Sequence, residues 1–434
     1  MALSTQPYKG TRDFYPEDKR IRDYMFKVMR KVCRSYGYEE IDAPIIEPVE
    51  LYQAKSGAEI VNEQTYVFTD RGGRQVAIRP EMTPSVSRMV AARRQELAYP
   101  VRWFDIPNLW RYERPQRGRL REHWQLNVDI FGIKGLEADH EIIQVANGIM
   151  KAYKAKSSMY QIKINSRMLI NSLFTDYLGL QEVQSATLAK LIDRMHKMEP
   201  ATFVAEADAI FTPSQREDGA SDRLLAVLKT TDLGKLPDSL QAHSSVVQLK
   251  KLFELLNISG ISNAVFDVSV MRGFDYYTDI VFEVFDTDPE NNRSMFGGGR
   301  YDGLVGLFGV EPVPTVGFGM GDVTLLNFLE SHQLLPELPN ETELYVVLIG
   351  DVYTQAQKAI AGLRDMGLRV AVDSSGRKVG DQVKVASKKG IHYALFVGET
   401  ELHEDRFNLK NLQTGEESTH SLERIASLVK DYRS

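Results

Sequence analysis

Residues 167 to 257 have the spacing of helices, whereas strand-like runs lie on both sides of them. The helical runs are RMLINSLFTDYLGL, SATLAKLIDRMHKM and VVQLKKLFELLN, in which apolar residues recur at helical intervals. Strand patterns extend from about 64 to 132 and return from 264 to about 330. The chain is therefore predicted to contain one sheet domain, residues 1–330, that is interrupted by a helical insertion at about 167–257.

Short connections join the strand-like runs that precede the insertion. Two of these runs flank RGG between residues 64 and 80, and two more, 101–113 and 121–132, bracket a loop. Connections of hairpin length join antiparallel strands. Residues 17–36 have the spacing of an amphipathic helix, and Thr83 is placed to cap a second helix. The predicted fold class is α+β, with an antiparallel sheet and flanking helices.

The last part of the chain has a different pattern. A chain of 434 residues exceeds the size at which one core usually stops growing. Residues 331–342, SHQLLPELPNET, contain two prolines and no clear period, which indicates a linker. Beyond it, strand-like and helical runs alternate through residues 343–434. This alternation predicts a small α/β domain with a mostly parallel sheet.

Composition narrows the possible environments of the chain. The opening stretch MALSTQPYKGTRDFYPEDKR lacks an apolar segment, and no later run reaches the ~18 apolar residues of a membrane span. The sequence therefore predicts a soluble, cytosolic protein with no membrane partner. Its single cysteine, Cys33, excludes an internal disulfide and is interpreted as a core residue of a helix. No cysteine or histidine spacing indicates a zinc site, so no protein-bound metal is predicted.

Five arginines crowd the segment RYERPQRGRLREHWQ, residues 111–125, although the formal net charge of the chain is −6. Guanidinium groups bind phosphate or carboxylate oxygens with paired hydrogen bonds. Alternation along a strand at 121–131 puts polar residues such as His123 on one face and apolar residues on the other. Arg111 and Glu113 share a face if they too lie on a strand. The alternative is a solvated hairpin with exposed ion pairs that add little stability.

A second cluster, MRGFDYYTDIVFEVF, places Arg272 and two tyrosines before an apolar strand. Strict alternation puts Arg272 and Tyr277 on opposite faces, so both reach one site only if Gly273 marks a bulge or the strand begins later. The alternative is an edge strand with ordinary aromatic packing. Glu81 lies just before the predicted helix start at Thr83, where its carboxylate is available to backbone amides or to an ammonium group.

These segments resemble the histidyl-tRNA synthetases, a family of class II aminoacyl-tRNA synthetases, over essentially the whole chain. The matching motifs occur in the family's order and spacing. They are KGTRDFYP, EEIDAPIIE, RPEMTPSVSR, RYERPQRGRLRE, RGFDYYTDIVFE and GGGRYDGL. The resemblance implies a class II catalytic domain and a C-terminal anticodon-binding domain. It also implies a ligase that joins L-histidine to tRNA(His) through histidyl-adenylate, with ATP and Mg²⁺, in a homodimer built partly on the segment around Pro44.

The resemblance also implies roles for individual residues on the ATP side. Arg111 and Arg272 are expected to be catalytic and to contact the α-phosphate of ATP, where charge develops in the transition state. Glu113 is expected to hold the adenine amino group and Arg119 to lie near the outer phosphates. His123 occupies the position of the aromatic residue that stacks on adenine.

On the histidine side, the resemblance assigns one group of residues to the substrate ammonium and another to the imidazole ring. The ammonium group would be held by Glu81, Thr83 and Gln125. The imidazole ring would be held by Asp129, Tyr276 and Tyr277. In the C-terminal domain, the basic stretch GRKVGDQVKVASKKG would contact tRNA through Arg377, Lys378 and Lys384. A solvated helix face is the alternative for this basic stretch.

The sequence departs from the family pattern in three places. Asp129 stands where the family commonly has Glu, and His123 stands where it has Phe. In VGFGMGDVTLL, Val323 and Thr324 replace an expected Glu-Arg pair, so the arginine usually placed against adenine is missing. Two of the three changes fall on the adenine side of the predicted site.

A noncatalytic paralogue that senses histidine, such as the synthetase-like regulatory subunit of histidine biosynthesis, is the alternative function. Such a paralogue is expected to lack both RGFDYY and an anticodon-binding domain. Both features are present in this sequence, which favours the catalytic interpretation.

Overall fold

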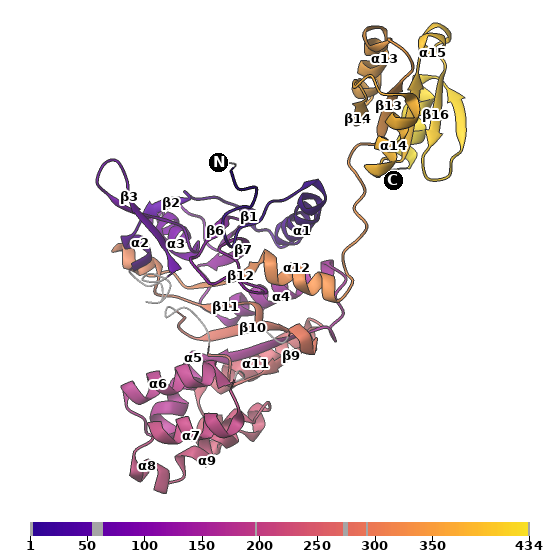
Figure 1. The fold of residues 1–434 in the computed structure, drawn as a ribbon. Coiled ribbons are helices and arrows are strands. Elements are labelled where there is room, and N and C mark those ends of the chain that lie inside the picture. The colour runs from indigo at the N-terminus through magenta and orange to yellow at the C-terminus, as the bar shows by residue number, and fades with distance from the viewer. Residues whose placement is uncertain (1–2, 54–63, 196–197, 272–276, 292–293, 433–434) are drawn as a thin grey trace. The chain divides into compact units, whose positions relative to one another are not determined.

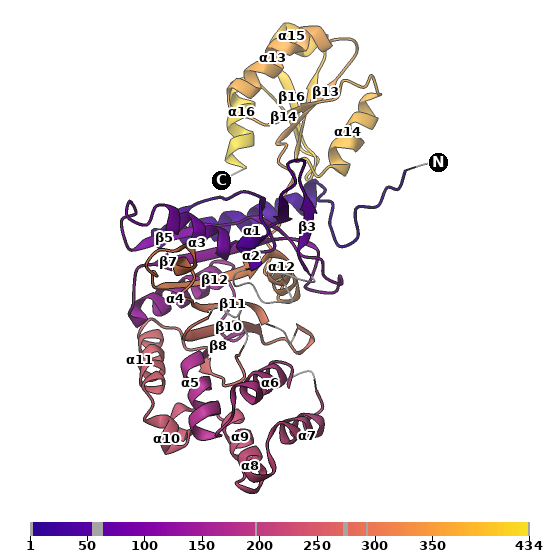
Figure 2. The ribbon, with the colours of Figure 1, turned by 90° about the vertical axis from the view of Figure 1, so that its left-hand side faces the viewer.

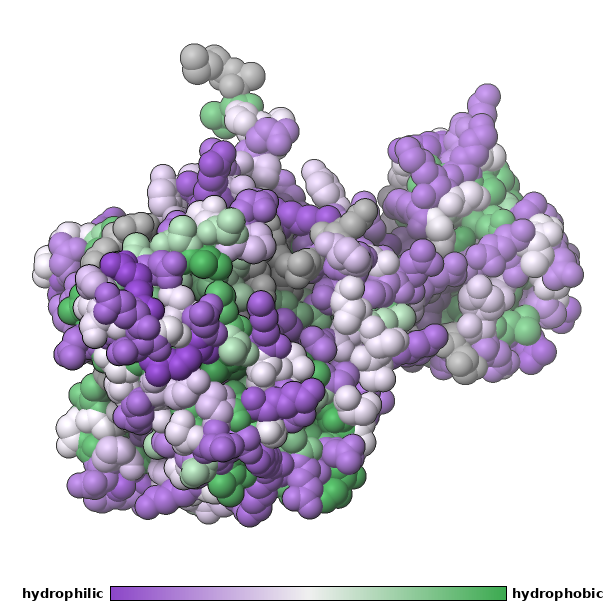
Figure 3. All heavy atoms as spheres, turned by 90° about the horizontal axis from the view of Figure 1, so that it is seen from below, coloured by the Kyte–Doolittle hydropathy of each residue, from purple (hydrophilic) through white to green (hydrophobic). Residues whose placement is uncertain are grey.

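The computed structural model describes residues 3–53, 64–195, 198–271, 277–291 and 294–432. The chain divides into two compact units, Met1–Leu335 and Pro336–Ser434, which are coloured from indigo to orange and from orange to yellow in Figure 1. No helix in the described ranges is long and apolar enough to cross a bilayer. Hydrophilic residues dominate the face drawn in Figure 3, in keeping with a charged content of 26%.

The first unit is built on a largely antiparallel sheet in which sequence-remote strands are neighbours. Its parallel pairs lie at the two ends of the sheet, where β1 joins β5 and β8 joins β9. β6 pairs separately with β7. In the order of the sheet, the other strands are β1 (Glu39–Glu40), β5 (Val101–Asp105), β7 (Glu122–Phe131), β12 (Thr315–Gly321), β11 (Ser294–Arg300), β10 (Ile280–Asp286), β8 (Tyr160–Ser166) and β9 (Ala264–Phe266), with β6 at Asn108–Trp110.

Three helices cover one face of this sheet: α1 (Pro16–Ser35), α4 (Leu136–Ala152) and α12 (Asp322–Ser331). The predicted amphipathic helix is confirmed as α1, which has a proline in its first turn and a basic residue in its last turn. Cys33 is fully buried on this helix, and burial raises the pKa of its thiol to about 12. The thiol is therefore an inert core group, as predicted.

Helices fill the stretch between β8 and β9, and Figures 1 and 2 show them gathered beyond the β8–β9 end of the sheet. Their buried leucines and phenylalanines belong to the same apolar cluster as the sheet face and α4, so the two parts share one continuous core. The helices are α5 (Arg167–Ser172), α6 (Glu182–Asp193), α7 (Pro200–Ile210), α8 (Pro213–Glu217), α9 (Ala220–Leu228), α10 (Asp238–Gln241) and α11 (Ser244–Ile258).

A separate three-stranded sheet has the order β2 (Ile46–Pro48), β4 (Gln75–Ile78), β3 (Tyr66–Thr69). The predicted hairpin around RGG is confirmed as β3 and β4, and Gly73 adopts the left-handed φ of 79° that its turn requires. The following helix α3 spans Thr83–Ala92, with Met82 as its N-cap. The prediction that Thr83 caps this helix is wrong, because Thr83 is already within the first turn.

The predicted strand at 101–113 is also shorter in the structure. β5 and β6 end at Asp105 and Trp110, and the chain then turns so that the Glu113 amide donates to the Arg111 carbonyl at 2.7 Å. Arg111 and Glu113 therefore do not share a strand face. A tight local turn, and not strand alternation, sets their directions.

The second unit has a five-stranded sheet in the order β14 (Val370–Val372), β13 (Leu344–Leu348), β15 (Tyr393–Val397), β16 (Phe407–Asn411), β17 (Glu417–His420). The first three strands are parallel, as predicted, and the last two form an antiparallel hairpin that the sequence pattern did not suggest. Its helices are α13 (Tyr353–Asp365), α14 (Val379–Lys388), α15 (Glu399–Glu404) and α16 (Leu422–Asp431).

A buried ion pair ties α4 to the end of β11. The Arg300 guanidinium lies 2.5 Å from the Asp139 carboxylate and also donates to the carbonyls of Ile133 and Gly135. Both side chains are almost completely buried. We expect Asp139→Ala to lower the free energy of unfolding of the first unit by about 3–5 kcal/mol, because the buried Arg300 would keep only its longer pair with the exposed Asp302, at 3.4 Å.

Urea unfolding followed by tryptophan fluorescence tests this prediction, because all three tryptophans of the chain lie in the first unit. The control is Glu206→Ala, which removes an exposed ion pair with Arg194 and should change stability by less than about 1 kcal/mol. Equal effects of the two substitutions would contradict the assigned importance of the buried pair.

Candidate active site

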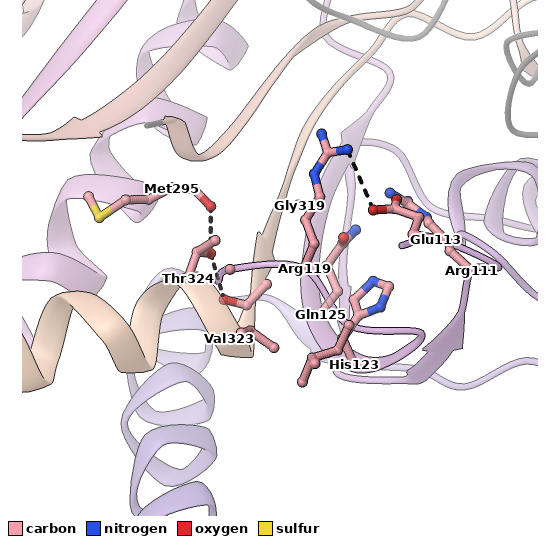
Figure 4. Close-up of a pocket in the computed structure, with 12 residues that line it drawn as sticks. Arg111, Glu113, Arg119, His123, Gln125, Met295, Gly319, Val323 and Thr324 are labelled. Atoms are coloured by element: carbon pink, nitrogen blue, oxygen red, sulfur yellow. Dashed lines mark hydrogen bonds and ion pairs between the residues drawn. The ribbon is translucent and has the colours of Figure 1, made fainter. Parts of the chain in front are cut away.

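A pocket of about 180 Å³ opens beside β7, β12 and the start of α12 (Figure 4). Many of its walls come from the arginine-rich segment after β6 and from the first half of β7. The residues that line it are Arg111, Glu113, Gly118, Arg119, Leu120, His123, Gln125, Met295, Gly319, Gly321, Val323 and Thr324. The structure thus brings together five side chains predicted from sequence: Arg111, Glu113, Arg119, His123 and Gln125.

Glycines on β12 face the polar side of β7. The strands pair so that Gly317, Gly319 and Gly321 stand opposite Asp129, Asn127 and Gln125. A methyl group at Gly317 would overlap the Asp129 carboxylate, and one at Gly319 would overlap the Gln125 amide. Residues opposite one another on antiparallel strands share a face, so the glycines leave this face open for the polar side chains of β7.

The other face of β7 is apolar, as the predicted alternation requires. Leu126, Val128 and Ile130 are fully buried in the core that α4 covers. His123 and Gln125 point into the pocket instead. One strand therefore supplies both core side chains and site side chains.

Arg111, Glu113 and Arg119 form a charged wall of the pocket, with two guanidinium groups and one carboxylate. Arg111 donates from Nε to the Pro80 carbonyl at 2.9 Å, which directs its guanidinium. Arg119 is half-exposed, and its Nη1 lies 3.5 Å from Glu113 Oε2 (Figure 4). This pair is weak because its distance is long and Arg119 is half-exposed, so both partners are available to exchange it for groups of a ligand.

Arg121 supports this wall from outside. Its guanidinium stacks on Tyr112 at 4.0 Å, donates to the Tyr8 hydroxyl at 2.8 Å and donates to the Glu113 carbonyl at 3.2 Å. The Arg121 carbonyl also accepts from the Arg111 amide at 2.8 Å. Arg121 therefore holds the segment that carries Arg111 and Glu113, using a tyrosine from the N-terminal segment that sequence spacing did not connect with it.

His123 is held neutral. Burial lowers its pKa to about 3, and the positive charges of Arg111 and Arg12 add to this effect. Thr324, which replaces the expected arginine, donates its hydroxyl to the Met295 carbonyl at 2.7 Å. Thr324 thus braces the pocket wall and does not extend a charge into it.

Arg12 and Asp322 lie directly behind His123, and sequence reasoning gave neither a role. Arg12 Nη2 lies 2.7 Å from Asp322 Oδ2, and Asp322 Oδ1 accepts from the Trp124 amide at 2.9 Å. The Arg22 guanidinium lies 4.2 Å from the Trp124 ring. These contacts tie the N-terminal segment and the start of α12 to the part of β7 that carries His123 and Gln125.

Asp129 lies deeper on the same face of β7. It accepts a short hydrogen bond from the Tyr301 hydroxyl, and the Tyr301 ring centroid is 6.4 Å from that of Tyr277. Burial raises the pKa of Asp129 to about 7, although the bond from Tyr301 opposes the shift. Tyr301 belongs to GGGRYDGL, and its role was missed because the pairing of β11 with β12, and of β12 with β7, brings it to Asp129.

Glu81 is fully buried just before α3, and Thr83 opens that helix. Burial raises the pKa of Tyr277, and the negative charges of Asp129 and Glu81 raise it further. Tyr277 therefore lies near both carboxylates. Glu81 and Thr83 do not line the pocket described above. Arg272 and Tyr276 lie outside the described residues.

The basic stretch of the second unit is exposed. Arg377 and Lys378 precede α14, and Lys384 on that helix lies 3.3 Å from Asp381 with most of its side chain in solvent. These three residues do not line the pocket described above. Within the described ranges, no group of three His, Cys, Asp or Glu side chains is arranged to hold a metal ion.

Known proteins match the chain along both units. The family description "Histidyl-tRNA synthetase" matches residues 10–323, and "Anticodon binding domain" matches residues 343–432. A protein named "Histidine--tRNA ligase" from Leptospira biflexa is 42% identical over 433 residues, covering 99% of this chain and 98% of its own. Another protein with that name, from Thermoplasma volcanium, is 37% identical and covers 97% of each chain.

A solved structure described as histidyl-tRNA synthetase from Nostoc sp. PCC 7120 has a TM-score of 0.82 with this chain. It is 24% identical and covers 99% of this chain and 100% of its own. At that identity the likeness bears on the fold alone, and it confirms the predicted α+β class with an antiparallel sheet.

The close approach of Gly317 to Asp129 leads to a testable prediction. We expect Gly317→Ala to lower the free energy of unfolding by ~1–3 kcal/mol, because the added methyl group overpacks the Asp129 carboxylate and the Val128 carbonyl. Urea unfolding followed by tryptophan fluorescence measures the change. The control is Gly321→Ala on the same strand, where the nearest atom to the added methyl is Thr324 Oγ1 at 3.6 Å. A loss with Gly321→Ala as large as that with Gly317→Ala would contradict the argument.

Proposed function

The chain belongs to the histidyl-tRNA synthetase family, and from that premise we propose how its residues share the reaction. The enzyme is a histidine–tRNA ligase. It activates L-histidine with ATP to form histidyl-adenylate and pyrophosphate, and it then transfers histidine to the terminal adenosine of tRNA(His). The observation that carries the proposal is that Arg111, Glu113, Arg119, His123 and Gln125 line one pocket together.

On the ATP side, Arg111 and Arg272 bind the α-phosphate and stabilise the charge that develops there in the transition state. Arg119 binds the outer phosphates, and Glu113 accepts from the adenine amino group. The weak pair between Arg119 and Glu113 supports this division, since ATP offers each partner a better one: phosphate for the guanidinium and an amino group for the carboxylate.

Mg²⁺ enters this site with ATP. Magnesium in nucleotide sites is bound mainly by substrate phosphates, one or two carboxylates and water. We therefore treat MgATP as the substrate form.

On the histidine side, Glu81, Thr83 and Gln125 bind the substrate ammonium. Buried carboxylate and amide oxygens suit a cation, and the burial of Glu81 strengthens its interaction with that charge.

The imidazole ring is read by Asp129, Tyr276 and Tyr277, to which we add Tyr301. Asp129 is shorter by one methylene than the glutamate that the family commonly has at this position. The hydrogen bond from Tyr301 fixes its carboxylate. A site whose buried polar groups need the ring nitrogens as partners rejects side chains that lack them.

The second unit binds the anticodon region of the tRNA. Arg377, Lys378 and Lys384 contact tRNA phosphates, because they are exposed and lie around one short helix.

A homodimer forms through the three-stranded sheet. Around its strands, Ile45, Ile46, Val67 and Phe68 are each between 42% and 53% exposed, and apolar side chains gathered in this way favour burial by another chain. The second copy of this chain is the partner that we propose. We also propose a cytoplasmic location, where the tRNA substrate is used in translation.

The regulatory paralogue is the weaker alternative. It is expected to lack RGFDYY and an anticodon-binding domain, whereas this sequence contains the motif and matches the anticodon-binding description over residues 343–432.

The adenine side is tested by His123→Ala. We expect the KM for ATP to rise roughly tenfold, because stacking on a base contributes ~1–3 kcal/mol, while the KM for histidine changes by less than about twofold. Because the pKa of His123 is about 3, the ring stays neutral at ordinary pH, and His123→Phe should preserve the ATP dependence between pH 6 and 8. ATP–pyrophosphate exchange gives both constants. Equal rises in both KM values would refute the stacking role.

Arg272→Ala tests the transition-state role that family membership gives this residue. Adenylate formation should fall by roughly 10²–10³-fold, the loss typical of removing one donor to developing charge, while tRNA binding stays unchanged. Single-turnover formation of histidyl-adenylate is the measurement, and Arg74→Ala, in an exposed turn, is the control. A defect confined to tRNA binding would show that the role is misassigned.

A further inference from the structure

Two polar side chains continue the site behind Gln125. Gln125 Nε2 donates to Asn127 Oδ1 at 2.5 Å, and Asn127 Nδ2 donates to Asp105 Oδ1 at 2.6 Å. Asn127 is 4% exposed and Asp105 is 2% exposed. The three residues stand on one face of the sheet, since Asn127 pairs with Asp105 on one side and with Gly319 on the other.

The Asp105 carboxylate sets the direction of the hydrogen bonds that run from Gln125 through Asn127 to Asp105. An ionised carboxylate only accepts hydrogen bonds, so with Asp105 in this form Asn127 turns its NH₂ group toward Asp105, as it does in the structure. The Asn127 carbonyl oxygen then faces Gln125, which must donate to it from Nε2. The remaining polar atom of Gln125 is Oε1, an acceptor, and Gln125 lines the pocket.

If these hydrogen bonds ran the other way, Gln125 would present its NH₂ group, a donor, to the substrate ammonium. If Asp105 donated a proton to Asn127 Oδ1, the Asn127 NH₂ group would face Gln125 Oε1, and Gln125 would offer its own NH₂ group to the pocket. Two donors facing each other repel, so an ammonium group in front of Gln125 would find no acceptor there. The acceptor direction is the one that the substrate ammonium requires.

The surroundings of Asp105 both raise and lower its pKa, and so act on whether it is a carboxylate or a protonated acid. Burial raises the pKa of Asp105 well above its ordinary value, and the charges of Asp129 and Asp42 raise it further, whereas the Asn127 bond and the Arg79 charge lower it. A bound ammonium group in front of Gln125 stabilises the acceptor direction and with it the carboxylate form of Asp105.

We propose that Asp105 and Asn127 are positioning residues that make Gln125 an acceptor for the ammonium group of histidine. The inference rests on the proposed function, which assigns Gln125 to that ammonium. Asp105 and Asn127 do not touch the substrate; they decide which end of the Gln125 amide does.

Asp105→Asn in the full chain tests the proposal, because an amide both donates and accepts and so no longer imposes one direction. We compare the dissociation constants of histidinol, which keeps the ammonium, and of 3-(imidazol-4-yl)propionate, which lacks it. Histidinol should bind roughly tenfold more weakly, as expected for a lost hydrogen bond to a charged group, whereas the propionate should change by less than about twofold. Equal changes in both ligands, or none, would overturn the proposal.

A second variant and a control guard against misfolding. Asn127→Ala breaks the same chain at its middle and should show the same difference between the two ligands; a uniform loss would count against the proposal. Asn147→Asp also exchanges a buried amide and acid in the first unit, where Asn147 accepts from Tyr160, and it should alter neither ligand selectively.

Combining Asp105→Asn with Gln125→Ala tests the positioning role of Asp105 separately from the assignment of Gln125 to the ammonium group. If Asp105 acts through Gln125, Asp105→Asn has no further effect on histidinol once Gln125 is removed, and an additive effect overturns the proposal. Gln125→Ala with normal histidinol affinity would refute both the ammonium assignment and this inference. Weakened binding in Gln125→Ala together with normal binding in Asp105→Asn would leave the assignment standing and overturn the positioning role alone.

Discussion

The pairing of β7 with β12 is the constraint on which the site depends. In this register each glycine of GFGMG that faces the pocket stands opposite a polar residue of β7. A shift by one residue would turn Leu126 and Val128 toward the pocket and Gln125 and Asp129 into the core. The apolar contacts on the covered face therefore hold the register that the chemistry needs. One face of β7 packs in the core, and the other face supplies the polar side chains of the site.

That register also explains how so many polar groups are buried beside one another. Asp105, Asn127 and Asp129 are each no more than 5% exposed, and burial of unpaired polar groups is costly. Each of them has a short-range partner: Asn127 for Asp105, Asp105 and Gln125 for Asn127, and Tyr301 for Asp129. The glycines make these contacts possible, because a larger residue at Gly317 or Gly319 would occupy the same space.

Local patterns in the sequence were sufficient for part of this arrangement. Strand alternation predicted which residues of β7 face the site, and helical spacing predicted α1. Strand alternation also predicted that Arg111 and Glu113 share a strand face. That prediction is wrong, because a tight turn replaces the strand there.

Contacts between segments far apart in the chain were beyond such reasoning. Tyr8 reaches Arg121 across 113 positions, and Tyr301 reaches Asp129 across 172. These partners follow from the fold as a whole. The alternating glycines of β12 were the available signal that an unusual strand face lay opposite β7.

The part of the pocket that holds His123 and Thr324 shows how a departure from the family pattern is accommodated. Thr324 stands in place of arginine, and the positive charges of Arg111 and Arg12 depress the pKa of His123 in addition to its burial. A charged imidazole would repel the guanidinium of Arg111, which lines the same pocket. A neutral ring presents a flat surface to the pocket without that repulsion. Asp322 meanwhile binds Arg12 and the Trp124 amide, so the charge of Arg12 is paired outside the pocket, while Arg111 is one of the residues that line it.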